Sequence, residues 1–120
     1  MMSTARTLYE FFSSFGIPAY VENNVPDDAA LPYITYELVE PDSLSQASFT
    51  ARVWYMDESF AAITAKVDEI KQAIGWGRGF PVDGGVIWIW RDTNFCQFQP
   101  PDEPKIKIAY LSMIISCAVT

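Results

Sequence analysis

The stretch Gly84–Phe98, GGVIWIWRDTNFCQF, decides how the sheet of this protein has to be covered. In an extended strand, Val86, Trp88 and Trp90 share one face, and the two isoleucines between them share the other. A half-buried antiparallel strand alternates apolar with polar residues, because only one of its faces meets the core. Since both faces are apolar here, we expect one face to pack on a helix and the other on a second layer or a neighbouring copy.

Two helices are expected from apolar residues at helical spacing. The first spans Thr4–Phe15, with Ser3 or Thr4 as its N-cap and Gly16 at its end. The second begins after an N-cap at Asp57 and ends at Gly75. Its core-facing stripe contains Phe60, Ile63, Val67, Ile70 and Ile74.

Runs rich in β-branched and aromatic residues predict strands before and after the second helix. Polar or glycine-rich connections separate them, and the RDTN segment is expected to turn Val86–Trp90 back into a hairpin with Phe95–Gln99. The other expected strands are Tyr33–Glu40, Ala47–Met56 and Lys105–Val119, with a short extended segment at Ala19–Val21. The expected connections are the loops Glu22–Pro32 and Pro41–Gln46 and the segment WGRGFPVDGG, residues 76–85.

The last expected strand, Lys105–Val119, is long and is apolar on both faces after Lys107. Fully extended, a chain of this length would reach about 50 Å, which exceeds what one small sheet usually needs. We therefore expect it either to bend at a bulge and cross two sheets or to pair partly with another chain.

The order helix, two strands, helix, three strands predicts an α+β fold, a mostly antiparallel sheet flanked by two helices. With 120 residues, half of them hydrophobic, the chain fits a single domain, residues 1–120. Its net charge of −7 and eight scattered basic residues argue against ordinary nucleic-acid binding, which needs clustered cations to neutralise phosphates.

The composition also argues against enzyme chemistry. The sequence contains no histidine, which excludes Ser-His-Asp and Cys-His catalysis and histidine-ligated zinc. Cys96 and Cys117 do not have the spacing of metal ligands, and we expect buried thiols, with a disulfide between them as the less favoured alternative. Asp27 and Asp28 are adjacent loop carboxylates, which are usually solvated. We expect no catalytic residue, metal or cofactor.

The chain begins without the pattern of a signal peptide, and its longest apolar run, Ile108–Ile115, is too short to span a membrane. We therefore expect an intracellular protein with reduced thiols. The glycine-rich segment Gly75–Phe80 lacks both common phosphate-loop patterns and follows a helix, where those motifs precede one. Its Trp76 and Arg78 are residue types favoured at binding hot spots.

The order of these motifs resembles the small tail-terminator, or tail-completion, proteins of long-tailed bacteriophages, which are sometimes described as minor capsid proteins. The resemblance extends over nearly the whole chain and rests on pattern and order. Its most suggestive parts are LPYITYEL, Leu31–Leu38, and the hairpin that contains GGVIWI.

The resemblance implies a structural virion protein of the phage tail and neck, assembled in the bacterial cytoplasm. Members of this family form a homohexameric ring that caps the tail tube protein and offers a docking surface to the head-closure or connector protein. Genomic DNA passes through the ring. Since each copy carries a charge of −7, a repulsive channel would let the genome pass without trapping it.

The resemblance also points to two sets of contact positions. Contacts between subunits should use the surplus apolar faces, and axial contacts to tube and head should use exposed loops. The subunit-interface candidates are Trp88, Trp90, Phe98, Met113 and Ile115. The axial-contact candidates are Asp27, Asp28, Asp42, Ser45, Trp76, Arg78 and Phe80.

Two alternatives stay open. One is another neck or tail component, such as a head-closure or tube protein; a tube protein would polymerise without limit, whereas a terminator stops at one ring. The other is a small intracellular binding or adaptor module that docks through its tryptophan-rich hairpin.

Overall fold

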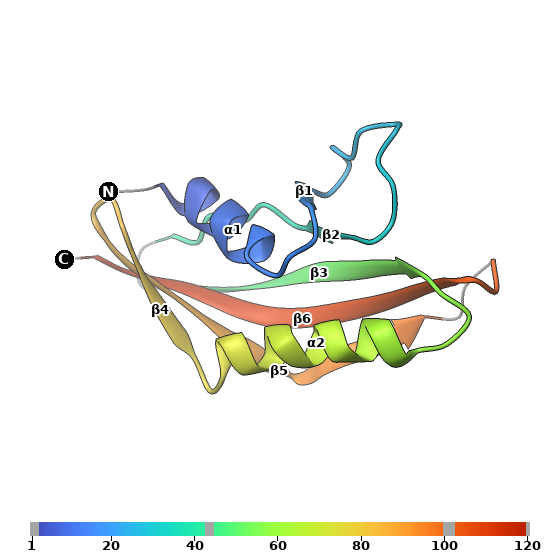
Figure 1. The fold of residues 1–120 in the computed structure, drawn as a ribbon. Coiled ribbons are helices and arrows are strands. Elements are labelled where there is room, and N and C mark those ends of the chain that lie inside the picture. The colour runs from blue at the N-terminus through green and yellow to red at the C-terminus, as the bar shows by residue number, and fades with distance from the viewer. Residues whose placement is uncertain (1–2, 43–44, 100–102, 120) are drawn as a thin grey trace.

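The computed structural model describes residues 3–42, 45–99 and 103–119. It has two helices and a six-stranded, mostly antiparallel sheet, which confirms the expected α+β fold (Figure 1). Ser43 and Leu44, in the expected loop Pro41–Gln46, and Pro100–Asp102 lie outside the described residues. In chain order the elements are α1 (Thr4–Ser13), β1 (Ala19–Val21), β2 (Tyr33–Tyr36), β3 (Gln46–Met56), α2 (Ala61–Ile74), β4 (Arg78–Val82), β5 (Gly85–Gln99) and β6 (Ile106–Val119).

The strands lie in the order β1-β2-β3-β6-β5-β4, and only β1 and β2 pair in parallel. The long strand β6 is therefore central, with β3 on one side from Ile106 to Ser116 and β5 on the other from Ile108 to Val119. The expected bend into a second sheet is wrong, because β6 stays within one sheet and strands of its own chain pair along most of both its edges. Pairing of its ends with another chain stays a prediction.

Both helices pack on the same face of the sheet. Phe12 of α1 stacks on Tyr36 of β2, with ring centroids 4.8 Å apart, and meets Phe49 of β3 edge-on at 6.4 Å. Tyr55, on the same side of β3 as Phe49, lies close enough to Lys66 of α2 for the two to interact electrostatically. The core between the helices and this face includes the fully buried Leu8, Phe12, Ile34, Ile63, Ile70, Ile87, Ile89, Leu111, Met113 and Ile115.

The helix ends differ in part from the expectation. Ser3 caps α1, since its hydroxyl accepts a hydrogen bond from the backbone N–H of Arg6 at 3.2 Å. The helix ends at Ser13, two residues earlier than expected. Asp57 does not cap α2: its carboxylate accepts a bond from the N–H of Ser59 at 3.2 Å, in a turn that precedes the helix.

The sheet edge after α2 also differs from the expectation. The segment expected as a glycine-rich connection contains β4, which pairs with β5 from Gly85 to Ile89. The segment RDTN forms no hairpin turn; it lies within β5, where the register against β6 shifts between Arg91 and Cys96. Such a shift is a β-bulge, which bends the strand without reversing it.

Candidate assembly surface

The face of the sheet opposite the helices, called here the open face, is covered by neither helix. The described part of the chain has no further helix or strand that could cover it. The strand register shows which side chains lie next to one another on this face: Trp54 lies beside Ile108, Trp88 beside Ser116 and Trp90 beside Ile114. Many of these residues are half-buried at most, and Trp88 is 45% exposed.

Aromatic rings fill the half of the open face near β1. The rings of Tyr20 and Tyr33 meet edge-on at 5.7 Å, and Tyr33 meets Trp54 at 6.0 Å. The indole Nε1 of Trp54 donates a hydrogen bond to the hydroxyl of Thr35 at 3.0 Å. The only polar side-chain atom of Trp54 therefore has a hydrogen-bond partner in the same chain, and the ring is held against the sheet.

Arg52 is the only charged residue that the register places on the open face, among the described strands. Its guanidinium lies 4.5 Å from the centre of the Tyr110 ring and 3.1 Å from the carboxylate of Glu22. Because cation and carboxylate are both partly buried, the pair adds little net charge to this face. The open face thus combines aromatic and small polar residues, and its charged groups among the described residues include the Arg52–Glu22 pair and the Glu37 carboxylate, which accepts a hydrogen bond from the Thr50 hydroxyl.

A hollow of about 440 Å³, called here the tryptophan hollow, lies at the β4–β5 end of the open face. Trp76, just beyond α2, is 95% exposed and lies at its rim. Trp88 lies across Gly79 of the next strand so closely that a Cβ there would come within 3.0 Å of the ring. The lining residues are Trp76, Gly77, Trp88, Trp90 and Ser116.

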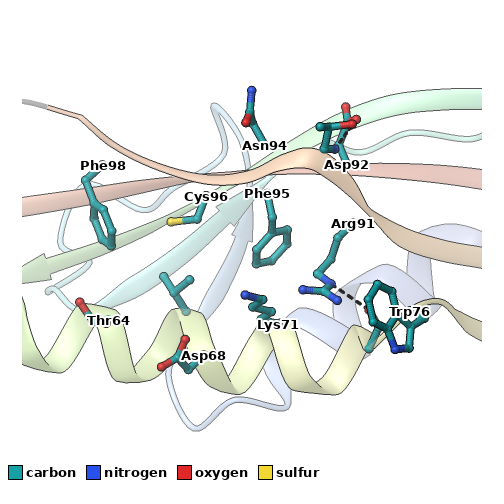
Figure 2. Close-up of a pocket in the computed structure, with 13 residues that line it drawn as sticks. Thr64, Asp68, Lys71, Trp76, Arg91, Asp92, Asn94, Phe95, Cys96 and Phe98 are labelled. Carbon is teal, nitrogen blue, oxygen red and sulfur yellow. Dashed lines mark hydrogen bonds between the residues drawn. The ribbon is translucent and has the colours of Figure 1, made fainter.

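A groove of about 710 Å³ lies on the helix side, between α2 and β5. Figure 2 shows Phe95, Cys96 and Phe98 of β5 directed toward the helix, while Asn94 points away from it. Burial raises the pKa of the Cys96 thiol, and Asp68 raises it further. The thiol therefore stays protonated at neutral pH and is a weak nucleophile.

The groove ends where β5 passes Trp76. Here the Nε of Arg91 donates a hydrogen bond to the carbonyl of Gly75 at 2.8 Å, which ties the end of α2 to the sheet. The same guanidinium lies 5.4 Å from the centre of the Trp76 ring (Figure 2). Lys71 of α2 lines this end of the groove, as does Asp68. This corner therefore combines an exposed aromatic ring with two cations and one carboxylate.

The structure separates the subunit-interface candidates into three groups. Trp88 and Trp90 lie on the open face, where a partner could reach them. Phe98 is 44% exposed but lies on the helix side, with its ring 5.4 Å from that of Phe60. Met113 and Ile115 are fully buried in the core, so their assignment to a subunit interface is wrong. Their register in β6 directs them toward the helices.

The axial-contact candidates fall into two groups, one in β4 and one in connecting segments. Arg78 and Phe80 lie in β4 and not in a loop, and both belong to the helix side, where Phe80 packs on Phe11 at 5.5 Å. The guanidinium of Arg78 lies 4.9 Å from the Phe80 ring. The other candidates, Asp27, Asp28, Asp42, Ser45 and Trp76, are exposed in connecting segments, as expected.

Two features of the surface were missed at the sequence level. The strand β4 contains Gly79 and Pro81, which are uncommon inside strands, although an edge strand tolerates both residue types. The contact of Arg52 with Tyr110 joins residues far apart in the chain and depends on the β3–β6 register. No local pattern in the sequence could have indicated it.

No protein-family model matches this chain, and no curated protein matches it. Among the described residues, no three His, Cys, Asp or Glu side chains are grouped as a metal site would require. Neither described helix is long and apolar enough to cross a membrane.

Proposed function

We propose that this protein is a tail terminator that assembles into a ring, caps the tail tube of a long-tailed phage and presents a docking surface to the head. The open face is the observation that carries the proposal. A sheet that is packed on one side and uncovered on the other, where Trp54, Trp88 and Trp90 lie, has a large surface to bury on assembly. The resemblance of the chain to tail-terminator proteins supplies the kind of assembly.

The size of the open face supports an assembly role. Each strand residue covers about 16 Å² of sheet, from a rise of about 3.3 Å and a strand spacing of about 4.8 Å. The central strands β3, β5 and β6 contain 11, 15 and 14 residues. They alone therefore offer roughly 600 Å², against about 800 Å² per partner in a stable interface.

The charge of the chain is compatible with a channel for DNA. A subunit with a charge of −7 contributes to a ring that repels phosphates, so the genome could pass without binding. This part of the proposal requires acidic side chains along the channel. A ring whose acidic residues all lie on its outer rim would contradict it.

Mass measurement of the purified chain, alone and with isolated tail tubes, tests the proposal. A tail terminator gives a discrete ring or a single cap at the tube end. Unlimited polymers would indicate a tube protein, and a monomer in both conditions would favour a binding module.

A matched pair of variants links assembly to the open face. Trp88→Arg and Tyr9→Arg each change an aromatic residue that is about half exposed, at 45% and 48%, but Tyr9 lies on α1. We expect Trp88→Arg to prevent assembly while the monomer stays folded, and Tyr9→Arg to assemble normally. If the two variants assemble equally well or equally poorly, the open face is not the surface through which the copies assemble.

A further inference from the structure

The two edges of the sheet carry surfaces of different chemistry. The loop of residues 22–32 joins β1 to β2 at one edge, and the connection from α2 to β4 passes the tryptophan hollow at the other. Figure 1 shows this loop projecting above β3 at the upper right and the α2–β4 connection at the lower left, below β6. Within one copy the loop and the hollow are therefore too far apart to meet, but two copies could join them.

The tip of the loop is a tight turn with two carboxylates. The N–H of Ala29 bonds to the carbonyl of Pro26 at 3.0 Å, which places Asp27 and Asp28 at the two central positions of the turn. Pro26 and both aspartates are exposed. Among the described residues, neither carboxylate has a cation within ion-pair distance.

Trp76 lies between two surfaces that together have the complementary chemistry, the tryptophan hollow on the open face and the end of the groove on the helix side. Trp76 and Trp88 offer exposed aromatic surface, on which proline rings pack well. Lys71 and Arg91 lie beside Trp76, and in the described part of the chain neither has a carboxylate within ion-pair distance. Asp68 lies beside these two cations, and Asp92 lines the adjoining groove, so the corner has two cations among carboxylates of its own chain.

We propose that the turn Pro26–Ala29 of one copy docks across Trp76 of the next copy, with Pro26 in the tryptophan hollow on the open face and the two carboxylates reaching past the indole ring to Lys71 and Arg91 on the helix side. The contact joins two different surfaces, so it is head-to-tail and closes a ring when its rotation permits. This is the contact between neighbouring subunits in the ring of the proposed terminator, so the inference rests on that proposed function. It also assigns Asp27, Asp28 and Trp76 to contacts between subunits in place of contacts along the tail axis.

Cysteine cross-linking tests the direction of the contact. In a Cys96→Ala, Cys117→Ala background that assembles like the wild type, a chain with both Asp27→Cys and Trp76→Cys should oxidise to a ladder of linked subunits. A mixture of the two single variants should stop at linked pairs. Linked pairs from either single variant alone would mean a two-fold contact and would overturn the inference.

Substitutions test its chemistry. Trp76→Ala should weaken assembly by about tenfold or more, whereas the control Tyr9→Ala, an exposed aromatic residue on α1, should not. Lys71→Glu should weaken it too, and adding Asp28→Lys should restore much of the loss. If the double charge reversal is no better than Lys71→Glu alone, the charge pairing is wrong.

The two proposals fail in different ways. Suppose that rings form normally despite Trp76→Ala, and that the doubly substituted chain forms no disulfide between positions 27 and 76. This result would overturn the contact and leave the proposed function intact. A wild-type chain that stays monomeric, both alone and with tail tubes, would overturn the proposed function together with this contact.

Discussion

Ile87 and Trp88 are neighbours in β5 whose side chains lie on opposite faces of one sheet. Ile87 has no exposed surface and packs in the core below the helices, whereas Trp88 is 45% exposed on the open face. The period of two along a strand places adjacent residues in these two environments. One strand therefore contributes both to the stability of the monomer and to the surface available for assembly.

Ile87→Ala should destabilise the monomer strongly. Truncation of a fully buried isoleucine removes apolar contacts and leaves a cavity, which costs about 2–5 kcal/mol. Trp88→Ala should cost about 1–2 kcal/mol, because the half-exposed ring leaves no enclosed cavity. Urea denaturation of the monomer measures both values. If both variants unfold the monomer to the same extent, Trp88 belongs to the core and the open face is not an assembly surface.

Gly79→Ala should strain the contact with Trp88. An added Cβ would come within 3.0 Å of the indole ring, so the ring must move, at a cost of about 1 kcal/mol. In a Trp88→Ala background the same substitution should be neutral or stabilising, because alanine restricts the unfolded chain more than glycine does. A double-mutant cycle by urea denaturation measures the difference. An equal cost in both backgrounds would place the strain in the backbone of β4.

Glu37→Ala should loosen the end of the β2–β3 pair. The Glu37 carboxylate accepts hydrogen bonds from the N–H of Thr50 at 2.6 Å and from its hydroxyl at 2.8 Å. Loss of bonds to a charged acceptor costs about 1.5–3 kcal/mol. Glu37→Gln keeps an oxygen at this position and should cost less. Thermal unfolding compares the two variants, and equal losses would show that the charge and not the acceptor position matters.

The sequence predicted the layers of this fold better than its edges. The helical stripe of α2 correctly identified Ile63, Val67, Ile70 and Ile74 as core residues, because periodicity reports burial directly, but it was wrong for Phe60, which precedes the helix and is 46% exposed. The surplus of apolar residues at Val86–Trp90 likewise indicated a face that lacks cover. Neither pattern could show that both helices lie on the same side, since that depends on how the connections cross the sheet.

Local turn signals misled the prediction at β5. The polar run Arg91–Asn94 has the composition of a turn, but the chain accommodates it as a bulge within one long strand. Pairing with β6 on both sides of the bulge stabilises the extended path. Long-range pairing of this kind overrides local propensity and is invisible in a single sequence.

Cys96 connects the groove to a measurable pH dependence. The thiol lies between β5 and α2, and burial, with Asp68 nearby, raises its pKa above the ordinary value (Figure 2). A free thiol has a pKa of about 8.5. At a pH slightly above this value, the folded protein therefore keeps a proton that the unfolded chain has already released.

This difference predicts that the free energy of unfolding falls as the pH rises. A group whose pKa is raised in the folded state contributes its full share to the free energy of unfolding below its unfolded pKa, which is about 8.5 for a thiol. It loses this share as the pH rises through the raised pKa of the folded state. Cys96→Ala should therefore have a flatter stability profile than the wild type between about pH 7.5 and 9.5. Cys117→Ala, the matched control, should keep the slope that Cys96 contributes. Urea denaturation across this range measures the profiles. If the free energies of unfolding of the wild type and Cys96→Ala differ by the same amount at every pH, the burial of Cys96 does not suppress its ionisation.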